Sequence, residues 1–166
     1  MAAVFGAGSG MAAAFLDLST GEFLATQFSG DAAWQRVLEQ LECFGPREII
    51  FPKSLEPLFK SGSKPEGESG TVTAEGDSGS TGLSFSGYQP ALNPLDEWFF
   101  SFDRARELLL THFGVASLEG FGLGGRDLAT AAAGGVLHYV RETQKDEAAH
   151  ITGLSYFEPN DYLKAR

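Results

Sequence analysis

Residues 120 to 125 have the glycine spacing of a phosphate-binding loop. Gly120, Gly122 and Gly125 satisfy the pattern G-x-G-x-x-G just before an expected helix, whose N-terminal N–H groups could hold a pyrophosphate. Only about 40 residues follow, too few for the rest of a dinucleotide fold. Glu142 lies inside the helix rather than at a strand end, where an acid would bind a ribose. A structural turn is the favoured interpretation, and nucleotide binding is a minor alternative.

Asp17 is the second candidate for chemistry, because it resembles the first acidic position of ribonuclease-H-like nucleases. Two-metal hydrolysis needs several carboxylates converging on metal ions about 4 Å apart. The candidate partners of Asp17 are Glu22, Glu48, Asp103 and Asp127, which form no clustered acidic motif. Glu48 also begins its expected strand instead of ending it. A turn aspartate is the favoured interpretation, and a stand-alone metal-dependent nuclease using Asp17 is kept as the alternative function.

The three histidines and the single cysteine lack the spacing of metal ligands. His112, His138 and His150 are far apart, and Cys43 has no second ligand nearby. Cys43 follows the apolar face of its expected helix, so we expect a buried and inert thiol. His138 and Glu142 are four residues apart and can form a side-chain pair. We expect neither catalytic residues nor a metal site.

The elements around these residues predict an α/β fold. Apolar runs at residues 2–5, 11–18 and 22–28, joined by short turns, predict an antiparallel meander of three strands. A helix with one buried face follows, with Asp31 as its expected N-cap. Residues 47–51 predict a buried strand parallel to one of the first three, so the expected sheet is mixed and flanked by helices.

Two more helices are expected in the second half of the chain. Asp103 is a candidate cap for a helix over residues 104–113, and Asp127 for a long helix over residues 128–144. A strip of small residues runs along the long helix, comprising Ala131, Gly134, Gly135 and His138. Glycine inside a helix costs about 1 kcal/mol relative to alanine. The strip therefore predicts very close packing against a neighbouring element.

Residues 61–94 interrupt this pattern. Residues 61–82 are rich in glycine and serine with almost nothing apolar, and residues 84–94 are expected to be irregular. We expect a flexible insertion. The chain also begins within an expected strand and ends as a new segment starts, which favours an excised fragment.

Charge and composition favour protein partners over direct DNA contact. A formal net charge of −10 repels phosphate, and phosphate contacts supply most nucleic-acid affinity. A lone cysteine suits a reducing cytoplasm, so we expect a cytoplasmic location. No stretch approaches the roughly 18 apolar residues of a membrane span, and we expect no membrane partner.

Several segments, in their order and spacing, resemble the connector domain of bacterial MutS proteins. The strongest is residues 131–144, a small-residue helix ending in the pattern Tyr-x-x-x-Thr-Gln. The others are Phe15-Leu-Asp-Leu-Ser-Thr-Gly-Glu-Phe23, Pro46-Arg-Glu-Ile-Ile-Phe51, Trp98-Phe-Phe-Ser-Phe-Asp-Arg-Ala-Arg-Glu-Leu-Leu108 and Leu118-Glu-Gly-Phe-Gly-Leu123. Residues 150–162 resemble the passage into the family's lever and core domain. The resemblance covers most of the chain outside residues 61–94.

This resemblance implies a ribonuclease-H-like fold that lacks the nuclease's carboxylate cluster. It implies a connector domain over residues 1–149 and the start of the lever and core domain over residues 150–166. Such a module links the mismatch-binding part to the ATPase and lever parts, and docks MutL when ATP has switched MutS into a sliding clamp. The segment itself would need no cofactor, with ATP and Mg bound elsewhere in the parent protein. Mismatched DNA would be contacted through the full-length protein only.

The resemblance places the MutL docking surface on the helix that follows Asp103. Its expected exposed positions are Arg104, Glu107, Leu108 and Thr111, with Glu107 and Leu108 matching the family's contact site by position. The alternative is an ordinary solvated helix face on which Leu108 is partly buried.

Overall fold

Three antiparallel strands form the centre of the sheet. The computed structural model describes residues 1–61 and 90–158. In it β1 (Ala2–Ala7), β2 (Gly10–Asp17) and β3 (Glu22–Ser29) pair in sequence order. Gly8 and Gly21 adopt positive φ angles of 60° and 82° in the two connecting turns, a conformation that glycine reaches without strain. The predicted meander is confirmed.

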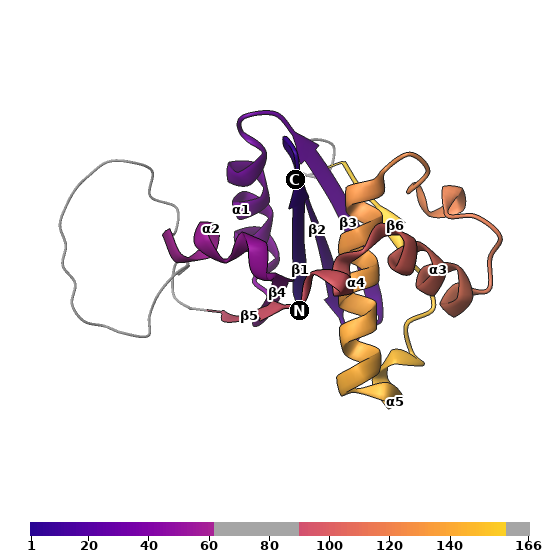
Figure 1. Ribbon diagram of the computed structural model, residues 1–166. Helices are drawn as coiled ribbons and strands as arrows, with labels where there is room; N and C mark the ends of the chain where they lie inside the picture. Colours follow the sequence, from indigo (N-terminus) through magenta and orange to yellow (C-terminus); the bar gives the residue numbers. More distant parts are fainter. Residues whose placement is uncertain (62–89, 159–166) are drawn as a thin grey trace.

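Parallel strands extend this meander on both sides. The order is β5-β4-β1-β2-β3-β6, with β4 (Glu48–Pro52) parallel to β1 and β5 (Ala91–Leu95) parallel to β4. The short β6 (Ser155–Tyr156) runs parallel to β3 at the opposite edge. Figure 1 shows this twisted mixed sheet between helices on both faces. The α/β fold is as predicted, with a ribonuclease-H-like meander, flanking helices and a strand parallel to one of the meander strands, which the structure shows to be β1.

Strand β5 corrects one prediction. Residues 84–94 were expected to be irregular; residues 84–89 lie outside the described part of the chain, as does most of the predicted insertion. Within Ala91–Leu95, however, Pro94 pairs with Phe51 of β4. Proline interrupts a central strand, but β5 is the last strand on its side of the sheet, where one edge needs no hydrogen-bonded partner.

One face of the sheet is covered by α1 (Ala33–Phe44) and α2 (Glu56–Ser61), which follows the short 3-10 helix η1 (Lys53–Leu55). The predicted apolar face of α1 is confirmed: Val37, Leu38 and Leu41 are buried, and Gly45 ends the helix in the left-handed conformation. The apolar core on this face also contains these strand and α2 residues: Ala2, Val4, Met11, Ala13, Phe15, Phe28, Ile49, Phe51 and Phe59.

The other face is covered by α3 (Phe102–Phe113) and α4 (Asp127–Thr143), with α5 (Lys145–Ala148) at the end of α4. Two 3-10 helices lead into them, η2 (Glu97–Phe100) before α3 and η3 (Glu119–Phe121) before α4. Helix α4 lies directly on β1, β2 and β3, and α3 lies against α4. In Figure 1 these helices stand in front of the sheet, on the side away from α1 and α2.

The small-residue strip of α4 produces the predicted close packing. A Cβ on Gly134 would overlap the backbone and side chain of Ala105 in α3. A Cβ on Gly135 would come within 2.5 Å of the Phe100 ring. Bare backbone is therefore required at both positions for α3 and η2 to approach α4.

The three predicted N-caps are wrong. The residues at the N-cap positions of α1, α3 and α4 are Ala32, Ser101 and Arg126, and none of them makes a side-chain capping bond. Asp103 and Asp127 lie in the first turns instead, where a carboxylate still interacts favourably with the helix dipole. At α4 the N–H of Ala129 donates to Oε1 of Gln27 in β3, 2.9 Å away, so the cap comes from the sheet.

Across residues 1–61 and 90–158, no helix combines the length and apolar character that crossing a membrane requires.

Candidate functional site

A groove of about 580 Å³ runs between α3 and α4. It brings together all four positions predicted for the docking surface, Arg104, Glu107, Leu108 and Thr111. Its remaining lining comes mainly from α4 and its ends: Phe99, Ala105, Gly134, His138, Arg141, Glu142 and Lys145. The helices α3 and α4 meet at Gly134 and Ala105, and both of these residues line the groove.

Helix α3 has one buried and one exposed side. Leu109 is fully buried, while Arg104, Glu107 and Thr111 are exposed. Leu108 is half-buried and packs against the core below α4. The exposed residues follow the spacing of one helix face, so they form a continuous surface beside the groove. Leu108 adds apolar area to that surface, but neighbouring residues cover part of its side chain.

An aromatic cluster that includes the groove residues Phe99 and His138 was not predicted. Trp98 is 44% exposed although its ring has three neighbours. It stacks on Phe99 with ring centroids 4.4 Å apart and lies 5.1 Å from the ring of His138. The Arg104 guanidinium sits 5.2 Å above the Trp98 ring, in the geometry of a cation–π contact. The aromatic run before α3 was its only sequence signal.

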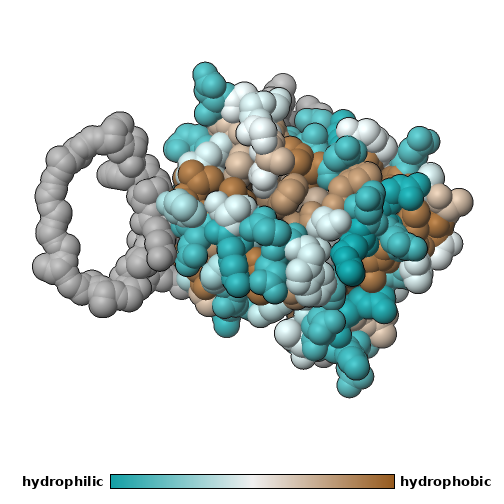
Figure 2. Space-filling model, in the orientation of Figure 1, coloured by the Kyte–Doolittle hydropathy of each residue, from teal (hydrophilic) through white to brown (hydrophobic). Residues whose placement is uncertain are grey.

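Charged side chains line the α4 wall. Nε2 of His138 is 3.1 Å from Oε2 of Glu142, which confirms the predicted pair. Arg141 and Lys145 are exposed farther along the same wall. Figure 2 shows polar and apolar surface alternating over the side of the molecule formed by α3 and α4. The groove is therefore amphipathic, with an apolar floor and charged rims.

His112 joins the end of α3 to the segment that follows α5. Its Nε2 lies 2.8 Å from the backbone oxygen of Ile151, and because a carbonyl only accepts, that nitrogen carries the proton. Nδ1 then accepts from Nη1 of Arg141 at 3.4 Å. Ile151 itself is buried in the core under α3 and α4. The candidate docking helix is thus bonded to the chain that leaves the sheet.

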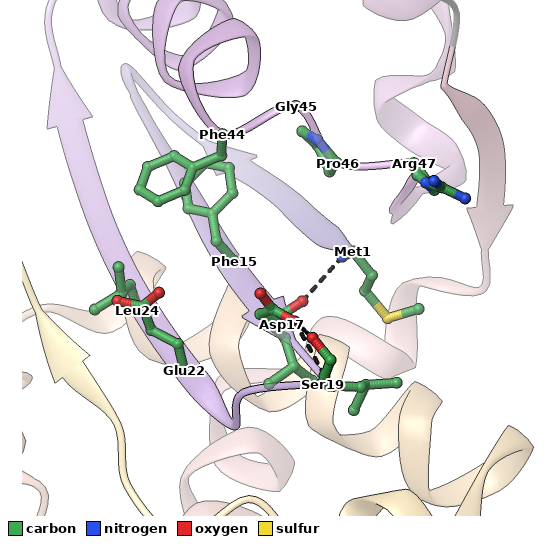
Figure 3. A pocket seen from close by; sticks show the side chains of 12 residues that line it. Met1, Phe15, Asp17, Ser19, Glu22, Leu24, Phe44, Gly45, Pro46 and Arg47 are labelled. Carbon is green, nitrogen blue, oxygen red and sulfur yellow. Dashed lines mark hydrogen bonds between the residues drawn. The ribbon is translucent and has the colours of Figure 1, made fainter.

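Asp17 lies in a second hollow, of about 440 Å³, where β2 ends beside the start of β1 and the end of α1 (Figure 3). Its carboxylate accepts hydrogen bonds from the backbone N–H and the hydroxyl of Ser19, at 3.0 and 2.7 Å. These bonds hold the pKa of the Asp17 carboxyl below its ordinary value. Glu22 pairs with it across the turn. The geometry is that of an Asx turn, in agreement with the favoured interpretation.

The other predicted carboxylate partners of Asp17 are engaged or lie elsewhere. The carboxylate of Glu48 accepts a bond from the Tyr139 hydroxyl at 2.7 Å and another from the Asn93 amide, so it ties α4 and β5 to β4. Asp103 and Asp127 begin α3 and α4. In the described ranges, no three His, Cys, Asp or Glu residues converge as a metal ion would require.

Burial and the bond to Glu48 raise the pKa of Tyr139 to about 12. Burial has the larger effect, because it disfavours the charged phenolate, and the neighbouring carboxylate opposes ionisation further. Tyr139 therefore stays a hydrogen-bond donor through neutral and moderately alkaline pH. Its hydroxyl holds α4 against the parallel half of the sheet.

The glycine-rich loop is a structural turn that supports β6. Gly122 has a φ of 85°, and a Cβ there would lie 3.0 Å from Cβ of Tyr156. Nη1 of Arg126 donates to the Gly122 carbonyl at 2.8 Å, and its guanidinium lies 4.0 Å from the Tyr156 ring centroid. Nη2 of Arg126 also reaches Glu158 at 3.5 Å. The loop thus holds the segment after α5 against the sheet.

The predicted burial of Cys43 is wrong, since this free cysteine is exposed. Cys43 follows the buried Leu41 by two residues, a rotation of about 200° around the helix. Its side chain therefore leaves α1 on the side opposite the apolar face.

Comparisons with known proteins agree on one family. A family model described as MutS domain II matches residues 1–152. The chain is 34% identical to the DNA mismatch repair protein MutS of Solibacter usitatus over 163 residues, which cover 98% of this chain and 16% of that protein. It is 33% identical to MutS of Symbiobacterium thermophilum, again over 98% of this chain and 16% of that protein. It is 34% identical to MutS of Bacteroides thetaiotaomicron over 91% of this chain and 14% of that protein. The chain thus spans about one sixth of the length of such relatives.

Proposed function

The chain belongs to the MutS family of DNA mismatch-repair proteins, as its domain II, and from this premise we propose that it is a connector module that docks MutL. The module links the mismatch-binding part of a longer protein to its ATPase and lever parts. The observation that carries the docking proposal is that Arg104, Glu107, Leu108 and Thr111 border one open groove. An ordinary solvated helix face would need no such hollow beside it.

The linking role is supported by how the last described residues are held. Ile151 and Leu154 pack in the core beneath α3 and α4, and β6 is paired with β3. His112 bonds the same segment to α3. A partner that moves α3 would therefore act on the chain leading into the following domain. The proposed boundary places the connector at residues 1–149 and the start of the lever and core domain at residues 150–166.

The module acts by binding rather than catalysis in this proposal. ATP and Mg would be bound by other parts of the full-length protein, and mismatched DNA would be contacted by the whole protein only. The formal net charge of −10 supports this division, because an acidic surface repels the phosphate backbone. The carboxylates considered for a nuclease are committed to a turn at Asp17 and to a structural bond at Glu48.

The docking proposal is tested by MutL recruitment to the full-length protein loaded on end-blocked mismatched DNA with ATP. The double change Glu107→Arg and Leu108→Asp reverses a charge and places a carboxylate at the groove edge, so we expect MutL binding to fall by about tenfold or more. The measurement is the MutL-dependent increase in mass on a DNA-coated surface.

A matched control carries changes of the same kind on the opposite helix layer, Glu39→Arg with the exposed Cys43→Asp in α1. It should recruit MutL normally. Normal recruitment by the α3 variant, with DNA loading intact, would show that α3 is not the docking surface.

A further inference from the structure

The groove concentrates unpaired positive charge in an acidic chain. Three cations border it, Arg104, Arg141 and Lys145, and none of them forms a salt bridge with any residue of the described ranges. Arg104 lies over the Trp98 ring, and Nη1 of Arg141 lies 3.4 Å from Nδ1 of His112. In a chain with a formal net charge of −10, this local excess favours an acidic ligand.

Two carboxylates also border the groove, which narrows the kind of acidic ligand it fits. Glu142 is paired with His138, whereas Glu107 lies on the opposite wall. Carboxylates beside the cations would repel the closely spaced phosphates of a nucleic acid. A peptide can place its acidic side chains opposite the cations and leave other positions neutral. The charge pattern therefore favours a protein segment over DNA or RNA.

Trp98, which contacts the groove residues Phe99, His138 and Arg104, supplies an anchor point beside the groove. Trp98 is 44% exposed, and its ring is already held by Phe99 and Arg104. An exposed tryptophan already held by residues that line the groove offers contact area at little cost in side-chain entropy. Tryptophan and arginine are also the residues that most often dominate binding energy at protein interfaces.

We propose that the α3–α4 groove binds an acidic segment of the docking protein, whose apolar side chain packs against Trp98 while its carboxylates pair with Arg104 and Lys145. This rests on the proposed function for the identity of the protein, MutL, and adds α4 and η2 to the docking surface. The docked segment then contacts both α3 and α4, which approach each other at Gly134. Its affinity therefore depends on the relative position of the two helices.

The test measures MutL affinity of the full-length ATP-bound protein on DNA with three variants. Arg104→Glu combined with Lys145→Glu should weaken binding by about tenfold and flatten its salt dependence. Trp98→Ala should weaken it by a similar factor without flattening the salt dependence, provided urea unfolding shows the variant to be folded. Arg106→Glu, a charge reversal at an exposed α3 position outside the groove lining, is the matched control and should bind normally.

A complementary experiment reverses the charge of acidic residues in MutL, one pair of residues at a time. One such reversal should restore binding to the Arg104→Glu and Lys145→Glu variant, and that rescue identifies the segment. If the Glu107→Arg and Leu108→Asp variant loses MutL while the groove variants bind normally, docking stands and the acidic-segment proposal is wrong. If none of the variants loses MutL, the docking surface itself is wrong.

A separate experiment tests whether the groove binds nucleic acid instead of an acidic protein segment. The 166-residue chain is titrated with a fluorescein-labelled duplex of about 20 base pairs at low salt, where phosphate contacts are strongest. We expect no saturable binding. Binding that is lost with Arg104→Glu and Lys145→Glu would overturn the proposal in favour of a phosphate-binding groove.

Discussion

At the residue scale, two glycines and one tyrosine decide how α4 sits against its neighbours. Gly134 leaves room for Ala105 of α3, and Gly135 leaves room for the ring of Phe100. Glycine lowers the helix propensity of α4, and the fold keeps it because any side chain would push α3 or η2 outward. Gly134 and Ala105 also line the groove.

Gly134→Ala should therefore destabilise the protein in spite of the better helix propensity of alanine. The new methyl group overlaps Ala105 backbone as well as its side chain, so the helices must separate. We expect a loss of about 1–3 kcal/mol in the free energy of unfolding, measured by urea denaturation.

Two further variants control this prediction. Gly120→Ala adds the same methyl group where no atom lies within 4 Å, and should change stability by less than about 0.5 kcal/mol. Ala105→Gly combined with Gly134→Ala should recover part of the loss. Equal stability of the Gly134→Ala variant and the parent would mean that α3 and α4 do not pack this closely.

Tyr139 makes a prediction about pH. Its pKa is raised from 10.0 to about 12, so the folded state favours the protonated hydroxyl. The stability from this group is fully present below pH 10 and is lost as the pH rises through about 12. Tyr139→Phe should cost about 1–2 kcal/mol at neutral pH, because Glu48 loses a donor.

The measurement is absorbance at the phenolate band in the folded protein across this pH range. One tyrosine should ionise about two pH units later than a free one, and its step should be missing in Tyr139→Phe. If the step missing in Tyr139→Phe lay near pH 10 instead, the burial of Tyr139 and its bond to Glu48 would both be contradicted.

At the element scale, the local sequence pattern predicted those strands and helices whose tertiary packing follows that pattern. Alternating and apolar runs gave β1 to β4, and Gly45 and Gly114 end α1 and α3 as glycines in the left-handed conformation. Strand β5 could not be read in this way, because Pro94 is tolerated only at a sheet edge. The cap of α4 was missed for a related reason: its acceptor, Gln27, lies about 100 residues away in the sequence.

The Gly120–Gly125 loop shows the same limit. Its spacing suggested phosphate binding, but its function in the fold is set by Tyr156, which no local pattern connects to Gly122. Arg126 holds that tyrosine and so fixes β6 to β3.

Arg126→Ala should loosen β6 while the rest of the sheet stays intact. The amide of Phe157 donates to the Ala25 carbonyl at 2.9 Å, and its hydrogen exchange should become about three- to tenfold faster. Amides of β1 and β2 should keep their rates, and the exposed Arg106→Ala in α3 should change neither region. Unchanged exchange at Phe157 in the Arg126→Ala protein would show that the guanidinium does not hold β6.

At the scale of the whole molecule, the sequence resemblance identified one wall of the candidate site and missed the other. The resemblance pointed to the helix after Asp103, and Arg104, Glu107 and Thr111 are exposed positions of that helix. The wall formed by Arg141 and Lys145 depends on the α3–α4 contact, and the partial exposure of Trp98 depends on where η2 is placed. Such features follow from tertiary packing, which spacing along the chain does not specify.

The proposed docking of MutL on α3 can be tested by placing a single reactive thiol on that helix. Cys43 is the chain's single cysteine, so Cys43→Ser gives a background in which one new thiol can be placed. Thr111→Cys lies on the exposed side of α3, and Glu39→Cys is an exposed control on α1, across the sheet.

The most direct measurement attaches a photoreactive maleimide to each thiol in the full-length protein with its other cysteines replaced, loads it on mismatched DNA with ATP, and quantifies cross-linking to MutL. Docking on α3 predicts an ATP-dependent cross-link from Thr111→Cys and none above background from Glu39→Cys. Cross-linking from Glu39→Cys alone, or from neither position while MutL is recruited, would contradict it.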